Sequence, residues 1–357
     1  MRLKIYKSLL FTALIVLASC KKDVQEPSNK LSGEELRSAN TMALAAPDGH
    51  LPLTVITIAG KYNIEGYADG VADQSRLLGV SGIDLADDGA LYVADTYNHR
   101  IRKITMPNIV STIKIPKSSS EESLFQPSIV RVQKDGTINV LAAPYEYQNL
   151  HSKFWIVKQG SSTSLTPIRH RADYTYYELE KDPYNNYLFI GGIKNTFTNG
   201  NDYQQAIIEK FLPDAEGSYG KDAIYLPQPA FSTIPDVTSL FCGYNAVKYI
   251  IIHSEKIYKL TPSGVYQELY RNHRFYQISD IVATKDSQTL YIAEQGAIKA
   301  ITDGKITYLV GPHKELKGRD GVGAKADIYA FKLALSKDEG TLYFSDGHTT
   351  VRKLLLR

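Results

Sequence analysis

Short apolar runs alternate with polar turns along most of the chain, and the clearest case is the stretch 88–104. The run Leu91-Tyr-Val-Ala94 has the length of a strand, polar residues 96–99 follow it, and Ile101-Arg-Lys-Ile104 resumes the apolar pattern. This order predicts a hairpin, because Asp and Asn side chains in a turn hydrogen-bond the backbone nearby. A lone hairpin is unstable in water. A similar sequence pattern recurs at residues 339–354, so we expect a repeated sheet unit.

Comparable apolar runs recur at intervals of about 41 to 62 residues, within or near the spacing of β-propeller blades. An alternating apolar segment precedes each run and predicts an inner strand, while further strand candidates follow it. The least convincing of these candidates is a fourth strand near Ser164–Ile168. The runs are centred on Val93, Val140, Phe189, Ile251, Ile292 and Phe344.

The sixth unit has three strand candidates before the last residue, Arg357. Its missing strand has a candidate near the other end of the chain, Leu53–Gly60, which resembles Ile306–Gly311. A strand from the N-terminal side that pairs near Leu354 would close a ring and cover the edges of both terminal units. We therefore predict an all-β fold, a six-bladed β-propeller over residues 51–357 with the N-terminal strand completing the last blade. An open solenoid or two sandwiches are the alternatives.

Several of these segments resemble an NHL repeat, a family named after an Asn-His-Leu triplet. They are Ala59-Gly60, Gly66-Tyr-Ala-Asp-Gly70 and the stretch 91–104, where the triplet stands as Asn98-His99-Arg100. Residues 310–354 echo the pattern, with His348 in the turn. The resemblance implies a β-propeller but no single function, because family members include binding modules, interaction scaffolds and a few lyases.

The N-terminus predicts export and a lipid anchor. Residues 1–19 have a basic start and an apolar run that is too short to span a bilayer comfortably, which is typical of a signal peptide. The end of this segment, Leu17-Ala-Ser-Cys20, resembles a bacterial lipobox and implies acylation of Cys20. Acyl chains contribute ~0.8 kcal/mol per buried CH₂, so several would hold the protein on a membrane. A cleavable signal with a chance cysteine is the alternative.

Residues 20–50 are polar and small, without apolar periodicity, and we interpret them as a flexible tether. The predicted location is the bacterial cell envelope, with the protein lipid-anchored. We favour the outer membrane, although the residues that follow Cys20 select neither membrane.

Charge and cysteine content narrow the function classes. Three basic residues lie in the predicted signal, so 38 of the 41 basic residues remain, against 38 acidic residues. A near-neutral chain gives no reason to expect nucleic acid as a partner. The two cysteines, Cys20 and Cys242, are no disulfide framework, and we expect Cys242 to be a small buried hydrophobe.

The turn after the second strand of the first blade holds Asp95, Tyr97, His99 and Arg100. We expect its Asp and Asn to satisfy backbone groups, and Arg102 and Arg352 to lie on solvated or ring-packing faces. Three histidines that follow second strands form the one constellation that could bind zinc: His99, His253 and His348. Otherwise we expect no cofactor, with zinc or calcium as the alternative.

Tyrosine is abundant, with 25 residues, and tyrosines on loops would suit stacking against sugar rings or a partner protein. Alternating tyrosines in strands are more often ordinary sheet residues, and this is the interpretation that we favour. Phosphate-loop, nucleophile-elbow and zinc-protease motifs are not present in the sequence, which favours a protein that is not an enzyme. We predict a binding module for a glycan, a peptide or an envelope protein. The alternative is a metal-dependent lyase or hydrolase that acts in the central channel. The predicted ligand-binding residues lie on the face of the turns between second and third strands: Asp95, Tyr97, His99, Arg100, His253 and His348.

Overall fold

A computed structural model describes residues 51–115, 123–143, 153–158, 166–168, 174–185, 187–198, 201–211, 221–226, 236–312, 317–347 and 349–357. The predicted signal peptide, the lipidation site Cys20, the tether and His348 lie outside these residues. Within the described ranges, no helix is both long enough and apolar enough to cross a membrane.

The described residues form six antiparallel sheets, so the predicted all-β fold and the count of six blades are confirmed. Blades 1 to 5 follow one another along the chain, and each begins with its inner strand. Their strands are β3 (Val80–Leu85), β4 (Leu91–Asp95), β5 (Arg100–Thr105) and β6 (Ile109–Thr112) in blade 1; β7 (Pro127–Val132), β8 (Ile138–Ala142), β9 (Lys153–Val157) and β10 (Thr166–Ile168) in blade 2; β11 (Tyr174–Lys181), β12 (Leu188–Thr198), β13 (Asn201–Phe211) and β14 (Lys221–Tyr225) in blade 3; β15 (Val237–Cys242), β16 (Lys248–Ile252), β17 (Lys256–Leu260) and β18 (Tyr266–Leu269) in blade 4; and β19 (Ile278–Ala283), β20 (Thr289–Glu294), β21 (Ala297–Thr302) and β22 (Lys305–Val310) in blade 5.

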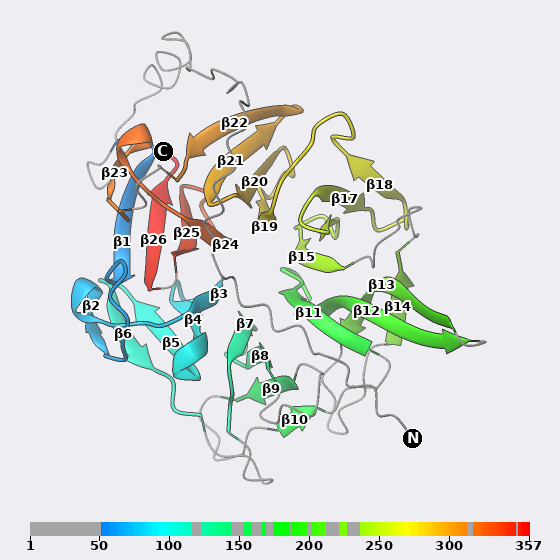
Figure 1. The fold of residues 1–357 in the computed structure, drawn as a ribbon, viewed down its shortest axis with the longest axis horizontal. Helices are drawn as coiled ribbons and strands as arrows, with labels where there is room; N and C mark the ends of the chain where they lie inside the picture. The colour runs from blue at the N-terminus through cyan, green and yellow to red at the C-terminus, as the bar shows by residue number, and fades with distance from the viewer. Residues whose placement is uncertain are drawn as a thin grey trace, which may run out of the picture. The chain divides into compact units, whose positions relative to one another are not determined.

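Blade 6 joins the two ends of the described chain. It consists of β24 (Ala330–Leu335), β25 (Thr341–Asp346), β26 (Thr350–Leu355) and the N-terminal strand β1 (Thr54–Gly60). Val55 pairs with Leu354 and Gly60 with Thr350, which confirms the predicted closure. Figure 1 shows β1 in blue beside β26 in red, and the six inner strands facing a common centre. The ring therefore closes through backbone hydrogen bonds between sequence-distant strands.

Blades 1 and 6 each carry a short fifth strand that the sequence analysis did not predict. These are β2 (Gly70–Val71), which pairs with β6, and β23 (Gly321–Val322), which pairs with β1. A single 3-10 turn follows each of them, η1 (Ala72–Gln74) and η3 (Gly323–Lys325). Each fifth strand covers the outer edge of its blade, which would otherwise expose unpaired backbone groups.

Apolar side chains between neighbouring sheets form the core. Trp155 on β9, for example, is buried in a cluster that combines Ala94 and Ile101 of blade 1 with Val130 and Val140 of blade 2. Cys242 is buried between blades 3 and 4, and burial raises the pKa of its thiol, as expected for a small core residue. Burial of one such large side chain stabilises the fold by roughly 1.5–3 kcal/mol, so each blade depends on its neighbours.

The ring has two ends, which we name by the turns they carry. The upper face carries the turns after the second strands, including η2 (Thr96–Asn98) of blade 1 and Gly347 of blade 6. The lower face carries the turns after the inner strands, such as that between β24 and β25. Because β1 is antiparallel to β26, it begins beside Leu355 at the lower face and ends beside Thr349 at the upper face.

Candidate binding site

A cavity of about 710 Å³ hollows the upper face where the six inner strands converge. Every inner strand contributes residues to its wall, and so do the turns after β4, β16, β20 and β25. Six serine and threonine side chains line it: Ser81, Thr96, Ser128, Thr238, Ser254 and Ser279. The volume lies in the range of small-molecule sites, and the face is the one that the sequence predicted for a ligand.

Aromatic side chains on the wall of the upper cavity remain exposed to solvent. Four of them are between 41% and 57% exposed: Tyr97, Tyr177, Tyr329 and Phe331. Two come from turns or connections and two from the inner strands β11 and β24. Large rings that remain exposed in a concave site offer flat apolar surfaces for a ligand to stack against.

Glycines hold two of these rings in place. Gly79 has φ +73°, and a Cβ at this position would lie 2.4 Å from the ring carbon Cδ2 of Tyr97. Gly296, with φ +78°, stands in the same relation to Tyr329, at 2.6 Å. Glycine accepts both the left-handed backbone and the close ring, so a larger residue at either position would displace the aromatic side chain.

Charged side chains form the floor of the upper cavity. Lys332 on β24 donates to Oε1 of Glu178 on β11 at 2.6 Å, and its Nζ lies 3.5 Å from Oδ1 of Asp280 on β19. Asp280 is further engaged, because Ser239 Oγ donates to Oδ1 and the Leu333 amide donates to Oδ2, each at 2.7 Å. Glu178 Oε2, in contrast, is buried and accepts no hydrogen bond within the described part of the protein.

Burial changes the protonation of this floor. Loss of solvation is the largest cause that raises the pKa of Glu178, and it takes that pKa to about 7, although Lys332 opposes the shift. For Lys332 burial disfavours the charged form, but Asp280 and Glu178 outweigh it and raise its pKa. Lys332 is therefore an ammonium at neutral pH, while Glu178 is close to half ionised.

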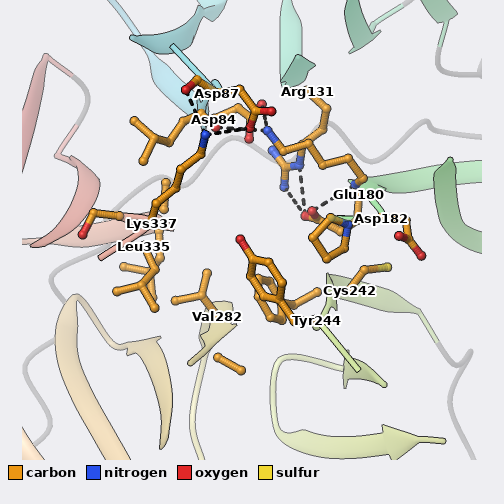
Figure 2. A pocket seen from close by; sticks show the side chains of 18 of the residues that line it. Asp84, Asp87, Arg131, Glu180, Asp182, Cys242, Tyr244, Val282, Leu335 and Lys337 are labelled. Atoms are coloured by element: carbon orange, nitrogen blue, oxygen red, sulfur yellow. Dashed lines mark hydrogen bonds and ion pairs between the residues drawn. The ribbon is translucent and has the colours of Figure 1, made fainter. Parts of the chain in front are cut away.

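A second layer of charges lies below the floor and borders a smaller cavity of about 150 Å³ at the lower face. Figure 2 shows this cavity, in which Arg131 and Glu180 of neighbouring inner strands point toward each other. Arg131 Nη2 lies 2.9 Å from Glu180 Oε2, and Lys181 Nζ lies 2.7 Å from Asp84 Oδ2. The two positive charges of Arg131 and Lys181 balance the two negative charges of Glu180 and Asp84. The lower cavity is thus small and lined by matched ion pairs, which makes the upper cavity the better candidate site.

The residues predicted around the turn of blade 1 fall in different places. Tyr97 lines the upper cavity. Asp95 is fully buried, where its Oδ2 pairs with Arg102 Nη1 at 2.6 Å and its Oδ1 accepts from the Leu78 amide at 2.7 Å. Asp95 therefore organises the turn, as the sequence suggested for its Asp and Asn, and it does not line the cavity.

The burial of Arg102 and Arg352 contradicts one expectation of the sequence analysis. They were expected on solvated or ring-packing faces, but both side chains are fully buried and paired within their own blades. Arg352 Nη1 pairs with Asp346 at 2.6 Å, as Arg102 does with Asp95. The reason is that two carboxylates compensate each guanidinium, one from the end of a second strand and one from the preceding connection.

The predicted histidines do not form a cluster in the described structure. His99 accepts from the Gln126 amide through Nδ1 and stacks on Phe125 with ring centroids 4.6 Å apart, and it lines a separate hollow with Arg100. His253 Nδ1 lies 2.9 Å from Asp236 Oδ1. His348 lies outside the described residues. Among the residues that the structure describes, no group of three His, Cys, Asp or Glu side chains is placed to hold a metal ion.

Sequence reasoning missed most of the upper cavity. Tyr177 and Glu178 both lie on the inner strand β11, but the sequence analysis singled out neither of them. A signal was present, since an acidic residue within an apolar inner strand points to a paired charge at the ring centre. Lys332, a charged residue within the apolar inner strand of blade 6, carries the same signal.

Six sheets whose inner strands converge on a common centre, with a cavity at each face, define a six-bladed β-propeller. More particularly, the family model described as NHL repeat matches residues 77–104, which contain β3, β4 and most of β5, so blade 1 is similar to an NHL repeat. No curated protein matches the chain.

Solved structures with the same fold come from several bacteria. An auxiliary nutrient binding protein from Bacteroides ovatus is 14% identical with a TM-score of 0.62, over 87% of this chain and 82% of that one. A structural genomics protein of unknown function from Bacteroides thetaiotaomicron is 15% identical with a TM-score of 0.61, over 85% and 75%. Virginiamycin B lyase from Staphylococcus aureus is 14% identical with a TM-score of 0.52, over 78% and 96%. At these identities the likeness concerns the fold, which both binding proteins and enzymes share.

Proposed function

We propose that the protein is a lipid-anchored binding module of the bacterial cell envelope that takes a glycan into the upper cavity without transforming it. The observation that carries the proposal is the set of exposed aromatic side chains around that cavity, Tyr97, Tyr177, Tyr329 and Phe331. A sugar ring presents apolar C–H faces to such rings and hydroxyl groups to the Ser and Thr side chains between them.

Two further points support the cellular part of the proposal. The lipobox-like residues before Cys20 predict a membrane anchor, for which the outer membrane is the favoured location. The Bacteroides ovatus structure of the same fold is named as an auxiliary nutrient binding protein, a role that fits an envelope location. Capture of a glycan at the cell surface would combine both features.

A glycan array with the purified protein tests the ligand class, and calorimetry on the glycans that bind gives their affinities. We expect Tyr177→Ala and Phe331→Ala each to weaken binding about tenfold or more, since a buried aromatic contact is a typical hot spot. The matched control is Tyr184→Ala, because Tyr184 is 61% exposed and lines neither cavity. Binding that all three variants retain would contradict the proposal.

Further assays on the same purified protein distinguish the other functional classes that the sequence left open. If peptides or envelope proteins bound in place of glycans and binding still depended on Tyr177, the proposed ligand class would be wrong. The upper cavity would remain the binding site. Conversion of the bound glycan would instead favour a lyase or hydrolase. So would stoichiometric zinc or calcium that is lost when His99 or His253 is replaced.

A further inference from the structure

The floor of the upper cavity carries information on the ligand that the aromatic wall does not. We propose that the cavity selects sugars with a free, protonated amine, whose ammonium group pairs with the Glu178 carboxylate. This inference rests on the glycan-binding function proposed above and specifies the class of glycan.

The first step is the charge balance of the floor. Two carboxylates, Glu178 and Asp280, face one ammonium, Lys332, so the ionised floor carries one excess negative charge. The other inner strands place no further charge at this level, where β3 has Gly82 and β15 has Ser239. Arg131 on β7 lies one layer below and is matched by Glu180.

The second step assigns the excess charge to one atom. Asp280 accepts from Ser239, from a backbone amide and from Lys332, so both of its oxygens are compensated. Glu178 has Lys332 on Oε1, while Oε2 has no partner in the described protein and its residue is only 3% exposed. A buried carboxylate oxygen without a partner is costly, and an ammonium supplied by a ligand would compensate it.

The third step concerns the other charges of the cavity wall. Besides Glu178 and Lys332, the charged residue on the described wall is Asp236, which lies beside His253. Lys332 is engaged by two carboxylates, so the wall offers an anionic ligand no unmatched cation. The exposed aromatic side chains favour a cation as well, since the faces of such rings attract ammonium groups. Acidic sugars are therefore disfavoured, and amino sugars meet both the rings and the floor.

The pKa of Glu178 gives the inference a measurable signature. With a pKa of about 7, this carboxyl is largely protonated at pH 6.5, and an incoming ammonium must displace its proton. Lys332, Asp280 and, from below, Arg131 are the charged groups that set this value. Binding of an amino sugar at pH 6.5 should therefore release a proton into the buffer, whereas binding of a neutral sugar should not.

The test compares glucosamine oligosaccharides with the same oligosaccharides after N-acetylation, by calorimetry at pH 6.5 in two buffers of different ionisation enthalpy. For the free-amine form we expect about tenfold to a hundredfold tighter binding and proton release, because one charge-assisted hydrogen bond is gained. Glu178→Gln should bring both affinities together and abolish the proton release. The matched control is Glu65→Gln, because Glu65 is exposed, lines neither cavity and should leave the preference intact. Asp236→Asn tests separately whether the other wall carboxylate binds the amine.

The outcomes separate this inference from the proposed function. Equal affinity for both forms, with dependence on Tyr177 retained, overturns amine selection and leaves glycan binding in place. A preference that disappears in Asp236→Asn but survives in Glu178→Gln also overturns it. Binding of neither form overturns the inference, and the glycan array then decides separately on the proposed function. The two wild-type measurements need no variant, so a misfolded Glu178→Gln protein does not prevent the test.

Discussion

Asp95 Oδ2 and Arg102 Nη1 lie 2.6 Å apart with both side chains fully buried, and Asp346 and Arg352 repeat this pair in blade 6 at the same distance. Each guanidinium also pairs with a carboxylate from the connection that precedes its blade, Asp69 for Arg102 and Asp320 for Arg352. The repeated phrase in the sequence thus encodes a repeated ionic clamp between a turn and a connection.

Loss of one partner of this clamp should destabilise the fold strongly. Arg102→Met leaves Asp95 buried without its cation, and we expect a loss of about 3–5 kcal/mol in the free energy of unfolding. Arg352→Met should behave alike, because its surroundings are the same. Urea denaturation measures the effect, and the exposed Arg100→Met is the control. A loss below about 1 kcal/mol in both variants would contradict the clamp.

Ring closure predicts an energetic coupling between the ends of the described chain. Val55 and Leu354 are cross-strand partners and both are buried. Leu354→Ala should cost about 2–5 kcal/mol, and a double-mutant cycle with Val55→Ala should give a coupling of about 0.5–3 kcal/mol. Leu51→Ala, at a site 52% exposed, serves as control. Strictly additive losses would show that the two strands do not depend on each other.

Glu178 should make the stability of the fold depend on pH. Its pKa is raised from 4.5 to about 7 in the folded protein, so the folded state binds a proton more tightly than the unfolded state does. The resulting stabilisation is present in full below about pH 4.5 and is lost as the pH rises through 7, a change of roughly 3 kcal/mol. Thermal unfolding of the wild type and of Glu178→Gln between pH 4.5 and 8 should show this difference. If the stability of the wild type and of Glu178→Gln depended on pH in the same way, a residue other than Glu178 would be responsible for the pH dependence.

The glycine under Tyr97 offers a test of how the aromatic wall is positioned. Gly79→Ala should displace the ring, because the added methyl would lie 2.4 Å from it, and should weaken glycan binding. Gly89→Ala is a matched control, since Gly89 has φ +81° and nothing lies within 4 Å of the added carbon. The control should cost about 1–2 kcal/mol of stability from backbone strain alone. Equal binding by both variants would mean that Tyr97 does not contact the ligand.

The anchor is tested in cells. Cys20→Ser should abolish incorporation of labelled fatty acid and release the protein from the membrane fraction, since acylation requires the thiol. Replacement of Cys242, which is buried in the core, is the control and should leave the lipid label in place. Continued membrane association of the Cys20→Ser protein would point to another mode of attachment.

Much of the fold could be predicted because it depends on periodic local signals. Strand alternation, turn residues and the recurrence of one phrase fix the blades, and the similarity of Leu53–Gly60 to Ile306–Gly311 predicts the closure. The fifth strands β2 and β23 were not predicted, because a strand of two residues is too short to show a periodic pattern. The strands β12 and β13 extend beyond their apolar runs, because their polar residues also pair across the two strands.

The candidate site could be predicted only in outline. The upper cavity lies on the face that the sequence analysis singled out for a ligand, and Tyr97 lines it. Tyr177, Glu178 and Lys332, however, meet only when strands of different blades converge, and their separations in sequence carry no sign of that convergence. Conversely, the buried pair of Asp95 and Arg102 could not be predicted, because its burial depends on compensation from a distant segment, through Asp69.

The strand β1 joins the ring at the lower face, whereas the aromatic cavity opens on the upper one. The described chain therefore begins at the lower face, on the opposite side of the propeller from the opening of the cavity. Attachment through this end of β1 would place the point of attachment and the opening of the cavity at opposite faces of the propeller.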